Sequence, residues 1–493
     1  MKPIRVFSFL AMVFVLLFGL MAIFPKDGFY LSEKYKLSFP TIADFFIPDT
    51  TAKKDLSHLF VDLDITPEVE ITPALDTVPK KVYDEAARLA KLDSLRRHSS
   101  KIQYPDGDWN VMYSFFEKLE EASTRKVRIS HYGDSQIEGD RITGYLRNEL
   151  QTKFGGNGPG LFPVIPVAPR MWAKNSLSDN WKRYAGFGRL DTAIKHKGYG
   201  AMLSLCRYAP YYDTITDLTP NHSAWFEIAP RFSSKATVFK EFNMYYNNCQ
   251  APVFVQVYNG EDLYFQDSLK LNDFGKMKII FDNPAPSIKI NFNGQASPDV
   301  LGISISSATG IIADNIPLRG ASGTEFSKTD KVLFEKMLRA LSPDLLILQF
   351  GGNVLPYVDT EEKAANYGRW LGTHIKMLRK MVPDAQVLVI GPADMSVKDG
   401  ENFVTHPFME PVRDAVKSAA FSAGAAFWDM YEAMGGKDSM PIWVNADPPL
   451  GAYDYIHFSP KGAQKIAQIF YQSLMHDYNT WKNIGLNEKT VHN

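Results

Sequence analysis

The chain has 493 residues, which predicts about three domains at the usual domain size. Its composition, 45% hydrophobic and 22% charged, is that of a folded globular protein and excludes a disordered chain, a collagen-like chain or a small disulfide-stapled domain. Lysine and arginine number 54 against 55 aspartate and glutamate, so the net charge is -1. This balance offers no broad basic surface, and we predict no nucleic-acid partner.

The N-terminal residues 1–25 have the pattern of a membrane anchor. Lys2 and Arg5 precede the 20 uncharged residues Val6–Pro25, which as a helix would span about 30 Å of hydrocarbon. The run lacks a small-x-small cleavage site and a following cysteine, so we predict an uncleaved signal-anchor helix, with cleavage as the alternative. The basic residues before the helix keep the N-terminus cytoplasmic and place the rest of the chain outside, in the periplasm or cell envelope.

Residues 26–107 are predicted to be a stalk. Pro67, Pro73 and Pro79 punctuate a sequence with acidic and threonine residues, which favours an extended backbone. Val82–Arg97 has alanine and leucine at helical spacing and charge on the other faces, so we interpret it as a solvated helix at the end of the stalk. The pattern of a globular domain begins after this segment.

Two separated segments, residues 108–169 and 309–480, alternate helical and strand-like patterns, and residues 481–493 form a C-terminal tail. The predicted helices are Trp109–Ala122, Arg141–Phe154, Lys331–Leu341, Glu361–Met381, Met409–Ala423 and Lys461–Tyr478. The predicted buried strands are Val127–Tyr132, Gly310–Asp314, Leu345–Phe350, Gln386–Ile390 and Ala426–Trp428. Strands that alternate with helices in this way predict a doubly wound parallel α/β sheet.

Residues 170–308 have a different, β-rich pattern. Seven short alternating runs, and the hairpin signal Asn259-Gly260, predict a β-sandwich inserted into the α/β domain. The runs are Ser223–Ala229, Ala236–Tyr246, Val253–Tyr258, Leu263–Leu271, Lys276–Phe281, Ser287–Phe292 and Leu301–Ser306. Their aromatic side chains are interpreted mainly as sandwich core, with contact to sugars as the alternative.

The chain has two cysteines, Cys206 and Cys249. They cannot form a disulfide framework, neither belongs to a CxxC pair, and no His/Cys cluster with metal-ligand spacing accompanies them. We interpret them as buried thiols, with a single bridge as the alternative if this part of the chain is exported. The sequence predicts no metal and no other cofactor.

The candidate nucleophile is Ser135, which follows a buried strand and precedes a helix. That position puts its hydroxyl at the carboxyl edge of the sheet, where α/β folds bind ligands. A serine needs a base to take its proton and a third group to orient the base, and His457 and Asp454 supply both just before the last helix. Donors for a developing oxyanion are the Ser135 N–H, the glycine loop 320–324 and the Asn353 carboxamide.

In these blocks the sequence resembles the SGNH (GDSL-like) hydrolase family. The matching blocks are Gly133-Asp134-Ser135, Gly320-Ala321-Ser322-Gly323, Gly351-Gly352-Asn353 and Asp454-Tyr455-Ile456-His457, each at the end of a strand or before the last helix. By this resemblance Ser135 is the nucleophile, His457 the general base and Asp454 its orienting carboxylate. Gly323 and Asn353 would complete the oxyanion hole with the Ser135 N–H.

A narrower resemblance rests on the run from Ser135 to Arg141, the glycine-rich loop Gly155–Gly160 and the β insert. These features look like envelope-associated SGNH proteins that act on O-acetyl groups of peptidoglycan or other surface polysaccharides, some as esterases and some as transferases. Two positions depart from the commoner family residues, because Gln136 replaces Leu and Val354 replaces Asp. Neither position carries a catalytic role in the family, so the departures bear on subfamily.

The family resemblance covers residues ~108–160 and ~308–478 and implies a serine ester hydrolase that removes O-acetyl groups from a cell-envelope carbohydrate. One alternative is an O-acetyltransferase that passes acetyl to an exported polysaccharide, with a membrane-bound acyltransferase as partner. The other is a non-catalytic, carbohydrate-binding envelope protein, against which the complete set of site residues argues. The expected partners are an acetylated carbohydrate or other small ester and, through the N-terminal helix, the membrane.

Overall fold

The computed structural model describes Met12 and residues 29–32, 35–37, 101–169, 172–231, 235–271 and 274–491, with the backbone alone from residue 485 onward. The predicted anchor helix (apart from Met12) and the helix predicted over Val82–Arg97 lie outside these residues. In the unit Met1–Asp55, β1 (Phe29–Ser32) and β2 (Tyr35–Leu37) form a short antiparallel hairpin. All other described elements belong to the second unit, Leu56–Asn493. Among the described residues, no helix combines the length and apolar character needed to cross a membrane.

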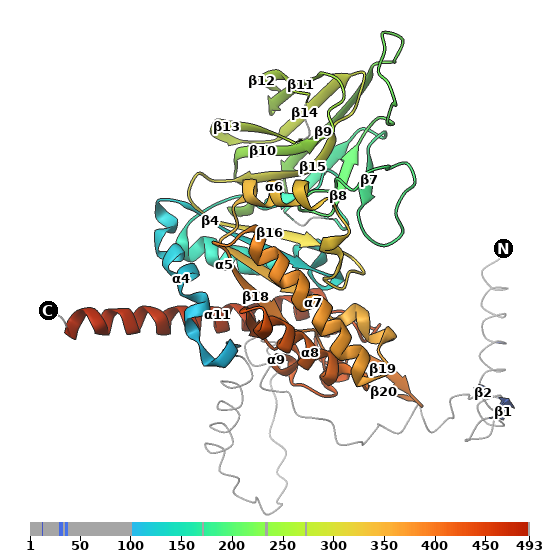
Figure 1. The fold of residues 1–493 in the computed structure, drawn as a ribbon, viewed down its shortest axis with the longest axis vertical. Coiled ribbons are helices and arrows are strands. Elements are labelled where there is room, and N and C mark those ends of the chain that lie inside the picture. Colours follow the sequence, from blue (N-terminus) through green and yellow to red (C-terminus); the bar gives the residue numbers. More distant parts are fainter. Residues whose placement is uncertain are drawn as a thin grey trace, which may run out of the picture. The chain divides into compact units, whose positions relative to one another are not determined.

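A six-stranded sheet lies at the centre of the second unit (Figure 1). Its strand order is β16-β4-β17-β18-β21-β3, in which the first five strands are parallel and β3 is an antiparallel edge. The strands are β16 (Gly310–Pro317), β4 (Lys126–Gly133), β17 (Leu345–Gln349), β18 (Gln386–Ile390), β21 (Ala426–Trp428) and β3 (Ile102–Gln103). Because β3 pairs with β21, the folded domain already includes residues 102 and 103, inside the segment predicted as stalk.

Side chains of the central strands alternate between two hydrophobic cores. In β17, Leu345 and Ile347 face one core, and Leu346 and Leu348 face the other. The first core is covered by α4 (Tyr113–Glu120), α5 (Thr143–Phe154) and α11 (Pro460–Val491), and the second by α6 (Lys331–Leu341), α7 (Glu361–Met381) and α8 (Met409–Ser422). The remaining elements of this part are β19 (Ser396–Asp399), β20 (Asn402–Thr405), α9 (Met430–Met434) and α10 (Ser439–Val444). Helices on both faces explain the continuous apolar runs and confirm the doubly wound α/β fold.

Between α5 and β16 the chain forms two antiparallel sheets (Figure 1). One has the order β13-β10-β15-β8-β7, with β5 paired to β15, and the other has the order β12-β11-β14-β9-β6. Their strands are β5 (Gly160–Phe162), β6 (Ala173–Leu177), β7 (Lys182–Ala185), β8 (Ser204–Arg207), β9 (His222–Pro230), β10 (Phe239–Asn247), β11 (Val253–Asn259), β12 (Asp262–Leu269), β13 (Gly275–Ala285), β14 (Ile288–Gly294) and β15 (Asp299–Ser306). Both sheets contribute to one core, which contains Phe242, Ile290 and Ile303.

Four of these strands are absent from the sequence prediction: β6, β7, β8 and β5. The first two carry polar sequences, AKNSL and KRYA, without the alternation that marks a half-buried strand. The insert also begins before residue 170, because β5 pairs with β15. Where the chain returns to the α/β domain, the Ile311 N–H donates to the Gly155 carbonyl at 2.9 Å. A Cβ on Gly156 would lie 2.5 Å from Ile311 backbone atoms, so the glycine permits this close approach.

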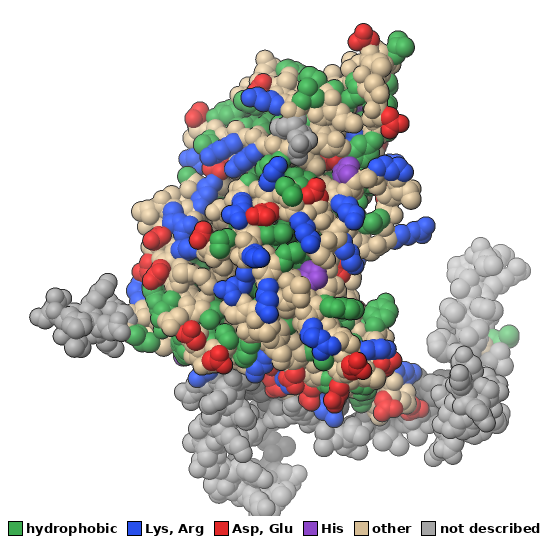
Figure 2. Space-filling model, viewed as in Figure 1, with side chains coloured by type: hydrophobic (Ala, Val, Ile, Leu, Met, Phe, Trp, Pro, Cys, Tyr) green, Lys and Arg blue, Asp and Glu red, His purple; other side chains and the backbone are tan. Residues whose placement is uncertain are grey.

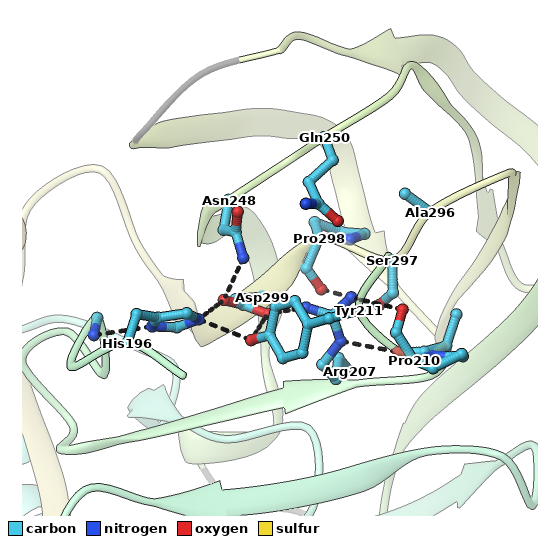
Figure 3. A network of polar contacts seen from close by, with 12 residues as sticks. His196, Arg207, Pro210, Tyr211, Asn248, Gln250, Ala296, Ser297, Pro298 and Asp299 are labelled. Carbon is cyan, nitrogen blue, oxygen red and sulfur yellow. Dashed lines mark hydrogen bonds and ion pairs between the residues drawn. The ribbon is translucent and has the colours of Figure 1, made fainter. Parts of the chain in front are cut away.

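A buried ion pair fixes irregular segments of the insert to β15 (Figure 3). Arg207 Nη1 donates to Asp299 Oδ1 at 2.6 Å, and the Tyr211 hydroxyl donates to the same oxygen at 2.8 Å. Asn248 donates to Asp299 Oδ2 at 3.3 Å, and His196 Nε2 lies 3.1 Å from that oxygen. Because Asp299 is fully buried, these partners offset the desolvation of its carboxylate.

The two cysteines lie in the insert and are buried. Cys206 is on β8 and Cys249 follows β10, and no disulfide joins these two described residues. Burial raises the pKa of the Cys249 thiol to about 11, so this thiol is protonated at neutral pH. The structure therefore agrees with the buried-thiol interpretation.

Candidate active site

Ser135 opens a short 3-10 turn directly after β4. At Gly133, the last residue of the strand, a Cβ would come within 3.0 Å of the Ile137 side chain. Asp134 caps the turn by accepting the Gln136 N–H at 2.9 Å. The chain therefore leaves the buried strand in a tight turn, which puts Ser135 at the carboxyl edge of the sheet.

Ser135, His457 and Asp454 form a continuous hydrogen-bonded series. Ser135 Oγ lies 2.7 Å from His457 Nε2, and His457 Nδ1 lies 2.7 Å from Asp454 Oδ2. Asp454 Oδ1 accepts the backbone N–H groups of Ile456 and His457, both at 3.0 Å. Partial burial works against the charged form, but these hydrogen bonds hold the pKa of Asp454 below its usual value. An anionic carboxylate at Nδ1 makes that nitrogen the N–H donor and leaves Nε2 to accept the serine proton.

Asn353 lines the same cavity as Ser135, at the start of the 3-10 segment Gly352–Tyr357 after β17. Its Nδ2 donates to the Ala321 carbonyl at 3.0 Å and to Asp134 Oδ2 at 3.3 Å. Burial raises the pKa of Asp134 to about 6. The carboxamide predicted for the oxyanion site is therefore held between the nucleophile turn and the loop after β16.

The glycine loop after β16 borders the cavity and then packs against Phe350. Arg319 and Gly320 line the cavity that contains Ser135. Gly323, predicted for the oxyanion site, packs against the Phe350 ring, where a Cβ would approach to 2.8 Å, and its φ is +82°. Among the described residues of this loop, Gly320 lines the cavity, and Gly323 lies three positions further along the chain beside Phe350. The oxyanion role of Gly323 stays a prediction.

The cavity has a volume of about 470 Å³. It is lined by Asp134, Ser135, Glu138, Arg141, Arg319, Gly320, Gly352, Asn353, Pro356, Met395, Ile456 and His457. Charged groups of both signs therefore surround the serine. In the part of the chain that the structure describes, no group of three or more His, Cys, Asp or Glu side chains is placed to hold a metal ion.

Gln136, which stands where the family commonly has Leu, connects the two halves of the site. Its Nε2 donates to the Ile456 carbonyl at 2.7 Å, and its Oε1 accepts the Phe458 N–H at 3.3 Å. Both acceptor and donor flank His457, so the side chain joins the serine turn to the histidine loop. A contact between positions 320 residues apart has no local signal in the sequence.

Arg141 makes a second connection that the sequence did not reveal. Its Nη2 donates to the Ser135 carbonyl at 2.7 Å, its Nη1 to the Phe458 carbonyl at 3.1 Å and its Nε to the Glu138 carbonyl at 3.0 Å. The guanidinium therefore fixes the backbone on both sides of the Ser135–His457 contact. Its place in the run from Ser135 to Arg141 was the only pointer to this role.

His131 lies on β4 beneath the site. Its ring nitrogens contact Gln349 Oε1 at 3.1 Å and Thr143 Oγ1 at 2.9 Å. Burial lowers its pKa to about 3, so the ring is neutral at physiological pH. It is a hydrogen-bonded core histidine and does not contact Ser135 among the interactions of the described residues.

Part of the chain matches a family of known proteins. Residues 291–465 match the GDSL-like Lipase/Acylhydrolase family. The matched segment contains Asn353, Asp454 and His457 but not Ser135, so the position of the serine rests on the contacts described above. A search of curated protein sequences gave no match.

A solved structure described as a peptidoglycan O-acetylesterase in action is similar, with a TM-score of 0.59 and 21% identity over 74% of this chain and 96% of its own. Two others overlap less. An acetyl xylan esterase, AlAXEase, has a TM-score of 0.25 and 16% identity over 33% of this chain and 80% of its own. A family two carbohydrate esterase from Clostridium thermocellum, in complex with cellohexaose, has a TM-score of 0.24 and 10% identity over 53% of this chain and 93% of its own. Residues 291–465 therefore form a GDSL-like lipase/acylhydrolase domain, and the protein is an ester-hydrolysing enzyme with the SGNH α/β fold that resembles O-acetylesterases.

Proposed function

We propose that the protein removes O-acetyl groups from a carbohydrate of the cell envelope through an acyl-serine intermediate. The observation that carries this proposal is the 2.7 Å contact of Ser135 Oγ with His457 Nε2 inside an open cavity. A hydroxyl paired in this way with an oriented imidazole is the arrangement that acyl transfer requires.

In the first step Ser135 Oγ attacks the acetyl carbonyl carbon while His457 Nε2 takes the hydroxyl proton. Asp454 accepts from Nδ1 and stabilises the imidazolium that forms. Collapse of the tetrahedral intermediate breaks the bond between the carbonyl carbon and the sugar oxygen. The proton on Nε2 passes to that oxygen, so the sugar leaves with a free hydroxyl and the acetyl group stays on Ser135.

The negative charge on the carbonyl oxygen needs donors that already point at its position. The donors assigned to this role are the Ser135 and Gly323 backbone N–H groups and Asn353 Nδ2, and Ser135 and Asn353 line the cavity. Gly320, which also lines the cavity, is a further candidate donor. Of the two Asn353 hydrogen bonds, the 3.3 Å bond to Asp134 is the longer, and the oxyanion replaces Asp134 as its acceptor.

In the second step a water molecule attacks the acyl carbon, and His457 Nε2 takes one of its protons. The intermediate then breaks the bond to Ser135 Oγ, which recovers its proton from the imidazolium. Acetate is released and the starting state is restored. If a held sugar hydroxyl takes the place of water, the same chemistry yields an O-acetyltransferase.

Two exposed tyrosines support a carbohydrate as the leaving group. Tyr357 follows the cavity residue Pro356, and Tyr453 precedes Asp454; their exposed fractions are 78% and 85%. Exposed aromatic rings close in sequence to site residues offer flat faces on which sugar rings can stack. The shared fold with a peptidoglycan O-acetylesterase supports the same substrate class.

Release of acetate tests the proposal directly. Wild-type protein and Ser135→Ala are incubated with acetylated xylan, O-acetylated peptidoglycan and 4-nitrophenyl acetate, and free acetate is measured. We expect acetate from the wild type and none above background from Ser135→Ala. Acetyl groups found on added unacetylated glycan, with little acetate, would assign the transferase activity. Full activity in Ser135→Ala would contradict the choice of nucleophile.

A further inference from the structure

Glu138 and Arg319 both line the cavity that contains Ser135. Arg319 Nε donates to Glu138 Oε1, and Arg319 Nη2 donates to Glu138 Oε2, each at 2.5 Å. This is a bidentate pair that occupies one edge of the planar guanidinium. The two residues come from different parts of the fold, the serine turn after β4 and the loop after β16.

The two side chains differ in exposure. Glu138 is 10% exposed, whereas Arg319 is 61% exposed. The Glu138 backbone is also fixed, because its carbonyl accepts from Arg141 Nε at 3.0 Å. Glu138 is therefore the fixed partner, and it holds the exposed arginine head in one orientation at the opening of the cavity. An arginine without this partner would lose more rotamer freedom on binding a ligand.

The opposite edge of the Arg319 guanidinium consists of Nη1 and the second N–H of Nη2. Among the described residues no hydrogen bond to Nη1 is observed, and the side chain is largely solvent-exposed. Two parallel N–H groups in one plane match the two oxygens of a carboxylate.

The other charged groups at the cavity are already engaged. Arg141 donates to three backbone carbonyls. Asp134 is buried and accepts from Gln136 and Asn353. Arg319 is thus the arginine at this cavity that is both oriented and able to bind a further anion.

We propose that Arg319 binds a carboxylate of the substrate, so that the acetyl ester cleaved at Ser135 is carried by an acidic sugar chain. This inference rests on the proposed function and adds the charge of the substrate to it. The carboxylate would accept two N–H bonds from the free edge of Arg319, while Glu138 keeps the other edge in place. Recognition of the charge then orients the sugar so that an acetylated hydroxyl reaches Ser135.

The ratio of activities on acidic and neutral substrates tests the inference. Acetylated oligogalacturonides and acetylated xylo-oligosaccharides, matched in length and acetyl content, are compared by kcat/KM for acetate release. We expect the wild type to favour the acidic substrate, and Arg319→Gln to lower the acidic-to-neutral ratio about tenfold, the scale of a lost hydrogen bond to a charged group. Arg319→Lys, which keeps the charge without the fork, should give an intermediate ratio.

Arg339→Gln is the matched control. Arg339 also pairs with a glutamate, Glu335 at 2.8 Å, and is 54% exposed, but it lies on α6 and does not line the cavity. Its removal should leave the ratio unchanged. Equal loss on both substrates in Arg319→Gln and Arg319→Lys, or no loss in either, would overturn the carboxylate assignment.

Binding without turnover separates this inference from the esterase proposal. Unacetylated trigalacturonate and xylotriose are titrated into the full-length Ser135→Ala protein and into Ser135→Ala/Arg319→Gln, with calorimetric detection. We expect tighter binding of trigalacturonate that depends on Arg319 and weakens with salt. If the wild type hydrolyses no ester but this preference is found, the proposed function fails and the anion site stands. Equal binding of both sugars would refute the anion site alone.

Discussion

Gln136 donates to the Ile456 carbonyl at 2.7 Å, so the turn that carries Ser135 is bonded directly to the loop that carries His457. Gln136→Leu removes this bond and leaves the buried Phe458 N–H without its acceptor. We expect kcat on 4-nitrophenyl acetate to fall by roughly 10–100-fold, because a small displacement of the base from the nucleophile lowers the rate steeply. The KM should change little.

Gln295→Leu serves as a control for that variant. Gln295 also bridges backbone groups, donating to the Thr216 and Thr219 carbonyls, but it lies in the insert. The Gln295→Leu variant should lose some thermal stability and keep the kcat of the wild type. If both glutamine variants lowered kcat to the same degree, the effect would be one of general stability.

The contact between Ser135 and His457 predicts that the losses of activity in variants of these two residues are not additive. Ser135→Ala and His457→Ala should each abolish most turnover, and the double variant should be no worse than either, because the two side chains act as one proton-transfer unit. Asp454→Ala should cost less than His457→Ala, since it orients and stabilises the imidazolium. Steady-state kinetics with 4-nitrophenyl acetate measure all four variants. Independent, multiplicative losses would contradict the shared proton transfer.

Removal of the Asn353 carboxamide measures how much one oxyanion donor lowers the activation free energy. Asn353→Ala should raise the activation free energy by about 2.7–4 kcal/mol, the scale for loss of one donor, with its main effect on kcat. Asn445→Ala is the control, because Asn445 Nδ2 also donates to a backbone carbonyl, that of Pro441, at an exposed position. A loss in Asn353→Ala that appeared only in KM would assign the carboxamide to ground-state binding.

Burial of Asp134 predicts a pH dependence of stability. Its pKa is raised from 3.8 to about 6 in the folded protein, so the folded state binds the proton more tightly than the unfolded chain does. The stabilisation from this proton is fully present below pH 3.8 and is lost as the pH rises through about 6. Asp134→Asn cannot ionise at this position and so does not lose this stabilisation as the pH rises. Between pH 4 and 7 the free energy of unfolding of the variant should therefore rise by up to about 3 kcal/mol relative to that of the wild type. Urea unfolding at several pH values measures the difference, and a constant difference would contradict the raised pKa.

The N-terminal sequence predicts that the intact protein is held at a membrane. We propose an uncleaved anchor in residues 1–25, with the esterase outside the cytoplasm, on the strength of the uncharged run Val6–Pro25. Full-length protein should fractionate with membranes, whereas a variant that begins near residue 100 should be soluble and active, because β3 begins at Ile102. Intact native chain in the soluble fraction would contradict the anchor.

The sequence predicted the sheet well, because its strands are buried on both faces. β17 and β18 read as continuous apolar runs, and the polar residues that follow them fall at one edge of the sheet. Ser135, His457 and Asp454 could be predicted for the same reason, since each follows a strand or precedes the last helix in a recognisable block. The α/β fold could therefore be predicted from local sequence patterns.

The remaining features depend on contacts between distant segments. β7, with the sequence KRYA, is a strand because it pairs with β8, and its own residues carry no alternating pattern. The Arg319–Glu138 pair joins residues 181 positions apart, and Gly323 packs on Phe350, which belongs to a different motif block. The periodicity of a sequence does not show which segments, far apart in the chain, contact each other.

The position of the insert has a consequence for the order of folding. Lys126 of β4 pairs with Gly310 of β16, although the whole insert lies between them in the chain. Closing an unstructured loop of that length costs roughly 4–5 kcal/mol of chain entropy. If the insert folds first, the pairing of β5 with β15 and the bond from Ile311 to Gly155 bring the two strands together before they join the sheet. We therefore expect a chain leaving the ribosome to complete its catalytic sheet only after the insert has formed, and mutations that slow the insert to delay activity without touching Ser135.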